Sequence, residues 1–427
     1  MYRFIVSKAP RAQQRTALSI IHGKSGSKLP EPVALVPGGG SSQRALLYCG
    51  ALLLCECILV SICWWERFVL GNPGAPMFGW DFAVYWSASS VAMSHGAAAA
   101  YDWDLLRSTE ASILPAGVFG PFAYPPTFLA LIYPIARLSF NAALLAFSAC
   151  GTVLYLTVLR SAVRLPGVSW LVPALAFPGI WVAFLAGQNS LLTLAAAGGG
   201  LVLLRRNPVA AGACIAMLCV KPQLGVLFPL MLLCARQWRA LASAALFSLL
   251  YCGLVVVAFG SGVFVVFAHS LAVFRLVVAE NGGSILHGAP TVFAIARVAG
   301  YSVSISYLAH ALVSLIAVAI AARVWTTSSR FELRAAVFPV ATILLQPYLI
   351  YYDLAWLALP IAFLTVDFVR NGCTAFEAAV LVAAWLVPVQ GFIAIFFPAI
   401  GQWAPALLVC LLVIIARRNS RERPEHR

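Results

Sequence analysis

The chain of 427 residues contains only fourteen acidic residues, so few side chains could act as a carboxylate base. Asp81 lies in the aromatic stretch 79–86, where Trp80, Phe82 and Tyr85 are among its neighbours. Aromatic neighbours partly desolvate a carboxylate, which raises its pKa toward that of a useful base. Aromatic rings also suit the apolar faces of sugars. An interfacial belt of Trp and Tyr with an incidental Asp accounts for the stretch equally well.

Lys221 is the only lysine after Lys28, and it lies in the middle of an otherwise apolar run. An ammonium group inside a membrane costs about 2.5–3.5 kcal/mol on insertion scales, so it usually faces a cavity and a partner. A compact point charge suits an anion such as a phosphate. We therefore interpret Lys221 as a phosphate contact; the alternative is a lysine that snorkels from a short helix.

Other polar side chains interrupt or border apolar runs. Gln188 and Asn189 lie in a Gly-Gln-Asn-Ser sequence, which is as typical of a tight turn between helices as of a binding role. Tyr124 precedes two prolines at the start of a run, and Asp353 follows two tyrosines at the end of another, where it could be no more than an interfacial cap. His287 lies in a polar break without other histidines at metal-binding spacing.

The elements that must position these residues are membrane helices. The chain is 62% hydrophobic and 10% charged, with a mean hydropathy of +0.93. Soluble domains carry about 25% charged residues. A crossing helix needs about 20 apolar residues, so the apolar runs predict an all-α polytopic bundle of roughly 11–13 transmembrane helices. Two longer breaks, 71–120 and 261–302, predict two larger outer loops.

The basic residues are spread along the chain, which excludes a nucleic-acid surface as the cause of the net charge of +14. Arginines occur singly or in pairs between apolar runs, as the positive-inside rule expects of cytoplasmic loops. Both chain ends are therefore predicted inside, and the two long breaks outside. Apolar residues recur at steps of three and four over 264–278, which predicts an amphipathic helix in the plane of the interface.

Three parts follow from this pattern. Residues 1–44 are basic and rich in Gly and Ser, and they predict a disordered cytoplasmic tail. Residues 45–416 form the membrane domain, and 417–427 a second basic cytoplasmic tail.

One stretch does not fit a simple alternation of sides. If the N-terminal tail and Arg205 are inside and the first long break is outside, the chain must cross the membrane an odd number of times between that break and Arg205. Four apolar runs lie there, an even number: 122–138, 141–160, 169–186 and 188–204. We expect 169–204, with its prolines, to be short, broken or re-entrant. Non-helical backbone at that depth is tolerated where it lines a cavity, so this segment is a candidate site.

Cofactor chemistry has little support in the sequence. The eleven cysteines lie mostly inside apolar runs, with spacing that suits neither a zinc site nor a disulfide framework. No glycine-rich phosphate loop and no soluble nucleotide-binding domain are evident. We therefore expect no metal and no cofactor.

The ordered set of motifs resembles glycosyltransferase family 87, the polyprenyl-phosphate-mannose-dependent mannosyltransferase group, over roughly residues 45–416. The motifs are Asp81-Phe82-x-Val84-Tyr85, Tyr101-Asp102, Tyr124-Pro125-Pro126-Thr127-Phe128, Gly187-Gln188-Asn189, Lys221-Pro222-Gln223, Pro290-Thr291-Val292-Phe293 and Pro347-Tyr348 with Asp353.

The resemblance implies a GT-C fold with a catalytic Asp in the first outer loop and a lipid-linked sugar donor. By position, Asp81 would be the catalytic carboxylate, and Gln188, Asn189 and Lys221 would line the donor site. Four more residues are candidate supporting groups: Tyr85, Tyr124, His287 and Asp353.

These expectations agree with the chemistry of the residues. A polyprenyl phosphate is a good leaving group, so one base for the acceptor hydroxyl and one cation for the phosphate suffice. The predicted activity is inverting transfer of a sugar, mannose by the resemblance, from a polyprenyl-phosphate sugar to an envelope glycolipid or polysaccharide at the outer face of the plasma membrane. A transporter or lipid flippase is the alternative, because it shares the hydrophobicity and the buried cation.

Overall fold

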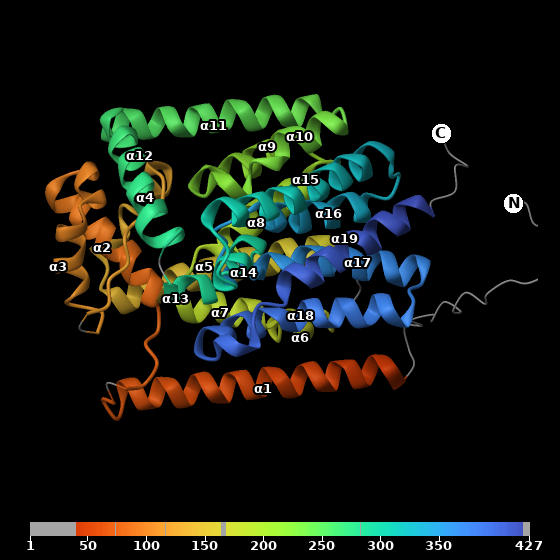
Figure 1. The fold of residues 1–427 in the computed structure, drawn as a ribbon, viewed down its shortest axis with the longest axis horizontal. Helices are drawn as coiled ribbons and strands as arrows, with labels where there is room; N and C mark the ends of the chain where they lie inside the picture. Colours follow the sequence, from red (N-terminus) through yellow and green to blue (C-terminus); the bar gives the residue numbers. More distant parts are fainter. Residues whose placement is uncertain (1–39, 73, 116, 164–167, 282, 422–427) are drawn as a thin grey trace, which may run out of the picture.

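The computed structural model describes residues 40–72, 74–115, 117–163, 168–281 and 283–421 (Figure 1). Within these residues the chain is 80% helical and has no β-strand, which confirms the predicted all-α class. Most of the predicted N-terminal tail lies outside the described residues.

Eight helical segments of the described residues are long and apolar enough to cross a membrane. Five contain one long helix each: α1 (Gly40–Phe68), α5 (Phe140–Val163), α11 (Trp238–Phe259), α15 (Val303–Thr327) and α18 (Ala375–Phe396). The other three combine two elements: α12 (Gly262–Phe274) with the π-helical turn η5 (Arg275–Ala279), η6 (Tyr351–Leu357) with α17 (Ala358–Asn371), and η7 (Pro398–Ile400) with α19 (Ala404–Ser420). The chain is therefore a multi-pass membrane protein.

The remaining apolar runs form shorter helices. These are α6 (Leu171–Leu175), α7 (Pro178–Ala186), α8 (Ser190–Leu203), α9 (Pro208–Ala216), α10 (Leu227–Cys234) and α16 (Phe331–Leu345). Pro178, the first residue of α7, separates α6 from α7 within the run 169–186, because a proline has no backbone N–H to continue the preceding helix.

Two of the four runs in the parity problem form helices shorter than a bilayer crossing. The run 122–138 yields only the seven-residue α4 (Pro126–Ile132) and the three-residue η2 (Ile135–Arg137), too short to cross a bilayer about 30 Å thick. Both contact α2 (Trp80–His95) in the first outer segment. The run 169–204 is also divided, into α6, α7 and α8 of five, nine and fourteen residues, which confirms the expectation that it is short or broken. The run 122–138, which was not expected to be short, is a second such piece.

Helices α9 and α10 form a hairpin with Lys221 at its tip. The tip consists of the short 3₁₀ turns η3 (Met217–Val220) and η4 (Pro222–Leu224), between which Lys221 has extended, non-helical dihedrals. Both arms pack against α11. A single apolar run in the sequence is thus two antiparallel arms.

The two long breaks lie together at one end of the bundle. In Figure 1, α2, α3 (Trp103–Glu110) and α12 are at the left, whereas α1 begins and α19 ends at the right. The ring of Tyr101 contacts that of Phe267, with centroids 5.8 Å apart, so the two breaks pack on each other. Helix α12 runs across the direction of α11 (Figure 1), as a helix in the interface plane would, although its length would allow a crossing.

At the opposite end of the bundle, ion pairs link the helices to one another. The Arg418 guanidinium contacts Asp367 at 2.6 Å and Glu377 at 3.0 Å, and Arg330 contacts Asp367 at 3.0 Å. Arg418 is buried within α19, which continues to Ser420, beyond the predicted end of the membrane domain at residue 416. These pairs tie α19 to α17 and α18 at the arginine-rich end.

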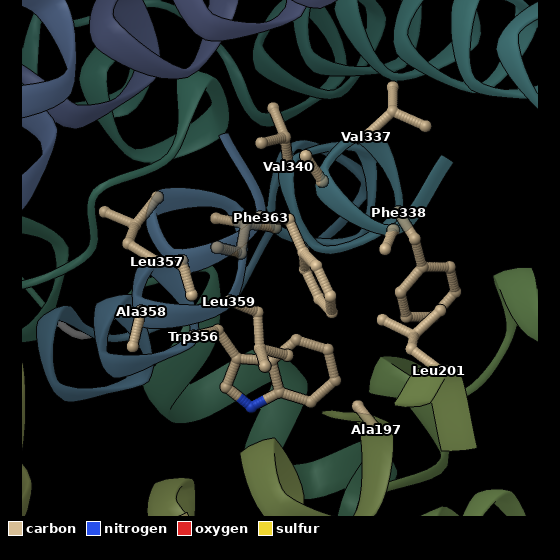
Figure 2. Close-up of a cluster of buried hydrophobic side chains, with 14 of the residues drawn as sticks. Ala197, Leu201, Val337, Phe338, Val340, Trp356, Leu357, Ala358, Leu359 and Phe363 are labelled. Carbon is tan, nitrogen blue, oxygen red and sulfur yellow. The ribbon is translucent and has the colours of Figure 1, made fainter. Parts of the chain in front are cut away.

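A hydrophobic core supports the segment that follows Asp353. Figure 2 shows Trp356 in one cluster with Ala197 and Leu201 of α8 and Phe338 of α16. The indole Nε1 of Trp356 donates a hydrogen bond to Thr193 Oγ1 at 3.1 Å. Since Trp356 is fully buried, η6 and the nearby Asp353 have a fixed position relative to α8.

The arrangement predicts that Ser108 and Gly283 face the outer side and Arg206 the cytoplasm. All three are exposed, and a side chain at Gly283 meets nothing within 4 Å. In a cysteine-free background, we expect a membrane-impermeant maleimide added outside to label Ser108→Cys and Gly283→Cys, and Arg206→Cys only after lysis. Labelling of either outer position from the cytoplasmic side alone would contradict the orientation.

Candidate active site

A close contact between two glycines sets the position of Asp81. Gly79 precedes α2 and Gly187 ends α7, and both have left-handed backbone, with φ of 69°. The Gly79 amide donates to the Leu185 carbonyl at 2.7 Å. A Cβ on Gly187 would lie 2.5 Å from Phe82 Cβ and 3.2 Å from Gly79 Cα. Only glycine fits there, and the contact places the start of α2 against the residues that follow Gly187.

Asp81 is held by Gln188, which is itself held by two tyrosines. Gln188 Nε2 donates to Asp81 Oδ2 at 2.9 Å. Gln188 Oε1 accepts from the Tyr85 hydroxyl at 2.5 Å and from the Tyr124 hydroxyl at 3.1 Å. The two tyrosine rings meet edge to face, 5.1 Å between centroids. The amide therefore has a defined orientation, with its N–H group toward the carboxylate.

Lys221 forms a buried ion pair with Asp353. Its Nζ lies 2.7 Å from both carboxylate oxygens, and the two side chains are 8% and 4% exposed. Ser190 Oγ donates to Asp353 Oδ1 at 2.7 Å, and the Lys221 ammonium lies 5.8 Å from the centre of the Tyr352 ring. Lys221 is thus not a solitary cation, and Asp353 is more than a helix cap.

The segment 188–190 joins the two groups. Gln188 contacts Asp81, and Ser190, two residues later, contacts Asp353. Asn189 between them is fully buried, and its Oδ1 and Nδ2 have no hydrogen-bond partner among the described residues. A buried amide without partners costs about 1–3 kcal/mol, so the site has unused hydrogen-bonding capacity.

The environment of Asp81 suits a base. Burial raises the pKa of Asp81 to about 6, although the hydrogen bond from Gln188 and the charge of Lys221 act in the opposite direction. A carboxylate with this pKa is mostly ionised at neutral pH yet more basic than an ordinary Asp. Asp353 differs in that its direct partner is an ammonium group, that of Lys221.

Other acids of the first outer segment have structural contacts. Asp102 caps α3 and accepts from the backbone amides of Asp104 and Leu105, as expected of a loop cap. Glu110 is buried, which raises its pKa to about 7, and it accepts a hydrogen bond from the Gly120 amide at 2.9 Å. No contact among the described residues joins Glu110 or Asp102 to Gln188.

The structure thus brings together seven of the eight predicted site residues. Asp81, Gln188, Tyr85 and Tyr124 form one network, Lys221 and Asp353 the second, and Asn189 lies between them. His287, in α13 (Gly283–His287), is separate: its backbone carbonyl accepts from Gln402, and no contact of the described residues joins its ring to either network. Ser190 was missed, although it follows Gln188 and Asn189 directly.

Comparison with known proteins gives the family. The family model of glycosyltransferase family 87 matches residues 122–347, more than half of the chain. The chain belongs to glycosyltransferase family 87. No curated protein and no solved structure matches it.

Membership of family 87 makes the protein a membrane glycosyltransferase. The matched segment contains Gln188, Asn189 and Lys221, whereas Asp81 and Asp353 lie outside it. The assignment of these two carboxylates to the site therefore depends on their contacts with residues inside the matched segment.

The contact between Gly79 and Gly187 predicts that Gly187→Ala strongly reduces sugar transfer while it changes the melting temperature less. The new Cβ would push α2 away from Gln188, and a displacement of about 1 Å at a catalytic group can reduce the rate about 10²-fold. Gly71→Ala is the matched control, because Gly71 has φ of 65° but nothing within 4 Å of the added Cβ. If sugar transfer by the two variants is reduced equally, backbone strain rather than the position of Asp81 is responsible.

Proposed function

We propose that this family 87 enzyme transfers a hexose from a polyprenyl-phosphate donor to an envelope glycolipid or polysaccharide. The resemblance of its sequence motifs to the mannosyltransferase group suggests that the hexose is mannose. The observation that supports the proposal is that Asp81 lies beside the buried pair of Lys221 and Asp353, through the segment 188–190. A base and a cation are the two groups that this reaction requires.

Asp81 is the general base of the proposed reaction. It removes the proton of the acceptor hydroxyl, whose oxygen then attacks the anomeric carbon. The bond from that carbon to the phosphate oxygen breaks, and the polyprenyl phosphate leaves with the bonding electrons. Attack from the side opposite to the phosphate inverts the anomeric centre. Gln188 orients Asp81, while Tyr85 and Tyr124 orient Gln188.

Lys221 stabilises the leaving phosphate. An ammonium has three N–H donors, and two of them suffice for the oxygens of Asp353, so one remains for an anionic ligand. The N-terminal end of α8, at Ser190, adds a positive dipole beside the same site. Asn189, which is buried and has no hydrogen-bond partner among the described residues, would contact the donor sugar or phosphate.

The alternative of a transporter or flippase has less support. Membership of family 87 favours transfer, and transfer needs a base for the acceptor hydroxyl, a role that suits the environment of Asp81. Incubation of the purified protein with radiolabelled polyprenyl-phosphate mannose and a membrane acceptor extract tests the proposal directly. Label in a product that resists mild acid, which cleaves the donor, supports transfer; movement of intact donor across vesicles without product supports the transporter.

Replacement of Asp81 tests the base. Asp81→Asn keeps the shape and the hydrogen bond to Gln188 but cannot accept a proton, so we expect turnover to fall about 10²–10⁴-fold with donor binding retained. The wild-type kcat/KM should fall as the pH drops below about 6, the pKa of Asp81, since the base becomes protonated. This acidic limb should be absent from the residual activity of Asp81→Asn.

Asp102→Asn is the control for Asp81→Asn, because Asp102 only caps α3. Its activity should be close to that of the wild type. If Asp102→Asn abolishes transfer while Asp81→Asn does not, the base is misassigned.

The ion pair is best tested with a double replacement. Lys221→Met alone leaves Asp353 buried without a partner, which costs about 3–5 kcal/mol of stability, so its loss of activity would be ambiguous. Lys221→Met with Asp353→Leu removes both charges and should recover much of the melting temperature. We expect the KM for the donor to rise about 10–100-fold in both variants, as for the loss of a charged hydrogen bond. A double variant with wild-type KM would disprove the phosphate contact.

A further inference from the structure

A second polar constellation surrounds Glu280, at the end of the outer helix α12. The Tyr307 hydroxyl donates to Glu280 Oε1 at 2.6 Å, and the Tyr348 hydroxyl lies 3.4 Å from the same oxygen. Arg275 Nε is 3.5 Å from it. Oε2 makes no hydrogen bond or ion pair within the described residues, and the side chain of Glu280 is 12% exposed. One carboxylate oxygen is thus fixed, and the other is available to a ligand.

Aromatic rings flank this carboxylate. Phe293 is fully buried and contacts the rings of Tyr307 and Tyr348, with centroids 4.7 and 5.5 Å away. The two tyrosines are partly exposed and meet at right angles, 6.3 Å between centroids. With Leu286 and Ala289, these rings belong to a small hydrophobic cluster separate from the main core. The tyrosine rings are therefore packed against Phe293 and remain partly exposed.

The backbone of Glu280 is held independently of its side chain. The five residues before it form the π-helical turn Arg275–Ala279, and π-helical turns occur frequently at functional sites. The Glu280 amide donates to the Arg275 carbonyl at 2.9 Å. Arg297 Nε and Nη2 donate to the Glu280 carbonyl at 3.4 and 3.2 Å. The carboxylate is therefore not needed to keep the end of α12 in place.

The segment 346–353 connects this constellation to the proposed catalytic centre. Tyr348 contacts Glu280, and Asp353, five residues later, contacts Lys221. Between them the Tyr351 amide donates to the Gly288 carbonyl at 3.0 Å, and Tyr351 lies near enough to Asp81 to interact with its charge. The three residues from Tyr348 to Tyr351 span at most about 11 Å. Glu280 therefore contacts the same short segment that interacts with Asp81.

We propose that Glu280, Tyr307 and Tyr348 form a binding subsite for a sugar unit of the acceptor, an inference that rests on the proposed transferase function. Free carboxylate oxygens accept hydrogen bonds from sugar hydroxyls, and aromatic rings contact the apolar faces of sugar rings. Arg275 balances the charge of Glu280, so a neutral polyhydroxylated ligand fits better than a second phosphate.

Three variants and one control test the subsite. Glu280→Gln removes the charge at constant shape, and Tyr307→Phe and Tyr348→Phe remove single hydroxyls while keeping the rings. Glu332→Gln is the matched control: Glu332 is also paired with an arginine, Arg370, and is 19% exposed, but it lies at the opposite, arginine-rich end. The full-length protein in nanodiscs would be used throughout.

The first measurement is direct binding of a sugar. Saturation-transfer NMR with methyl α-mannoside, methyl α-glucoside and methyl α-galactoside, each competed by its octyl glycoside, reports binding without any turnover. We expect binding of at least one glycoside to the wild type and to Glu332→Gln, and about tenfold weaker binding to Glu280→Gln. The second is transfer to the octyl glycoside: the acceptor KM should rise about tenfold for Glu280→Gln, with the donor KM unchanged.

The outcomes separate the subsite from the proposed function. Sugar binding that depends on Glu280, without transfer from any polyprenyl-phosphate sugar, retains the subsite and rejects the donor. Transfer with an unchanged acceptor KM in all three variants rejects the subsite and retains the donor. A parallel loss of melting temperature, donor KM and acceptor KM would show that the constellation only holds α12, and no binding of any glycoside to the wild type would also overturn the inference.

Discussion

An ammonium group buried among membrane helices needs a partner, and the pairing of Lys221 with Asp353 satisfies that requirement. The pair joins the tip of the α9–α10 hairpin to η6, and Ser190 adds the start of α8 through its bond to Asp353. Loss of one charge alone would leave the other buried, at about 3–5 kcal/mol. Three segments that are far apart in the sequence are therefore fixed relative to one another by one interaction.

The second constraint is the contact of Gly79 with Gly187, which brings α2 to the same place. It creates two carboxylates with different environments at one site. Asp353 contacts a cation, whereas the direct partner of Asp81 among the described residues is the amide of Gln188, and burial raises the pKa of Asp81 to about 6. Two nearby acids with distinct environments allow distinct roles, and the environment of Asp81 is the one that suits a base.

The sequence predicted the helical class and the main chemical groups, but not the pairs. Lys221 stood out because it is isolated in an apolar run, and Asp81 because of its aromatic neighbours. The partner of Lys221 is 132 residues away, and no periodicity reports such a contact. The short α4 was misread as a crossing because its composition is apolar, while the length of a helix depends on where prolines end it. Gln188 was found as a polar interruption, but its direction toward Asp81 depends on the backbone of Gly187.

The length of the arm formed by α9 and η3 limits how far into the membrane Lys221 can lie. The nine residues of α9 and the four of η3 span about 20 Å, less than the hydrocarbon thickness of about 30 Å. If α9 begins at the cytoplasmic boundary marked by Arg205 and Arg206, Lys221 lies below the outer surface, within the outer leaflet. A water-soluble nucleotide sugar would have to leave water to reach it. The proposed lipid-linked phosphate would already be at the leaflet, so only its charge would need compensation there, which a single lysine paired with Asp353 could supply.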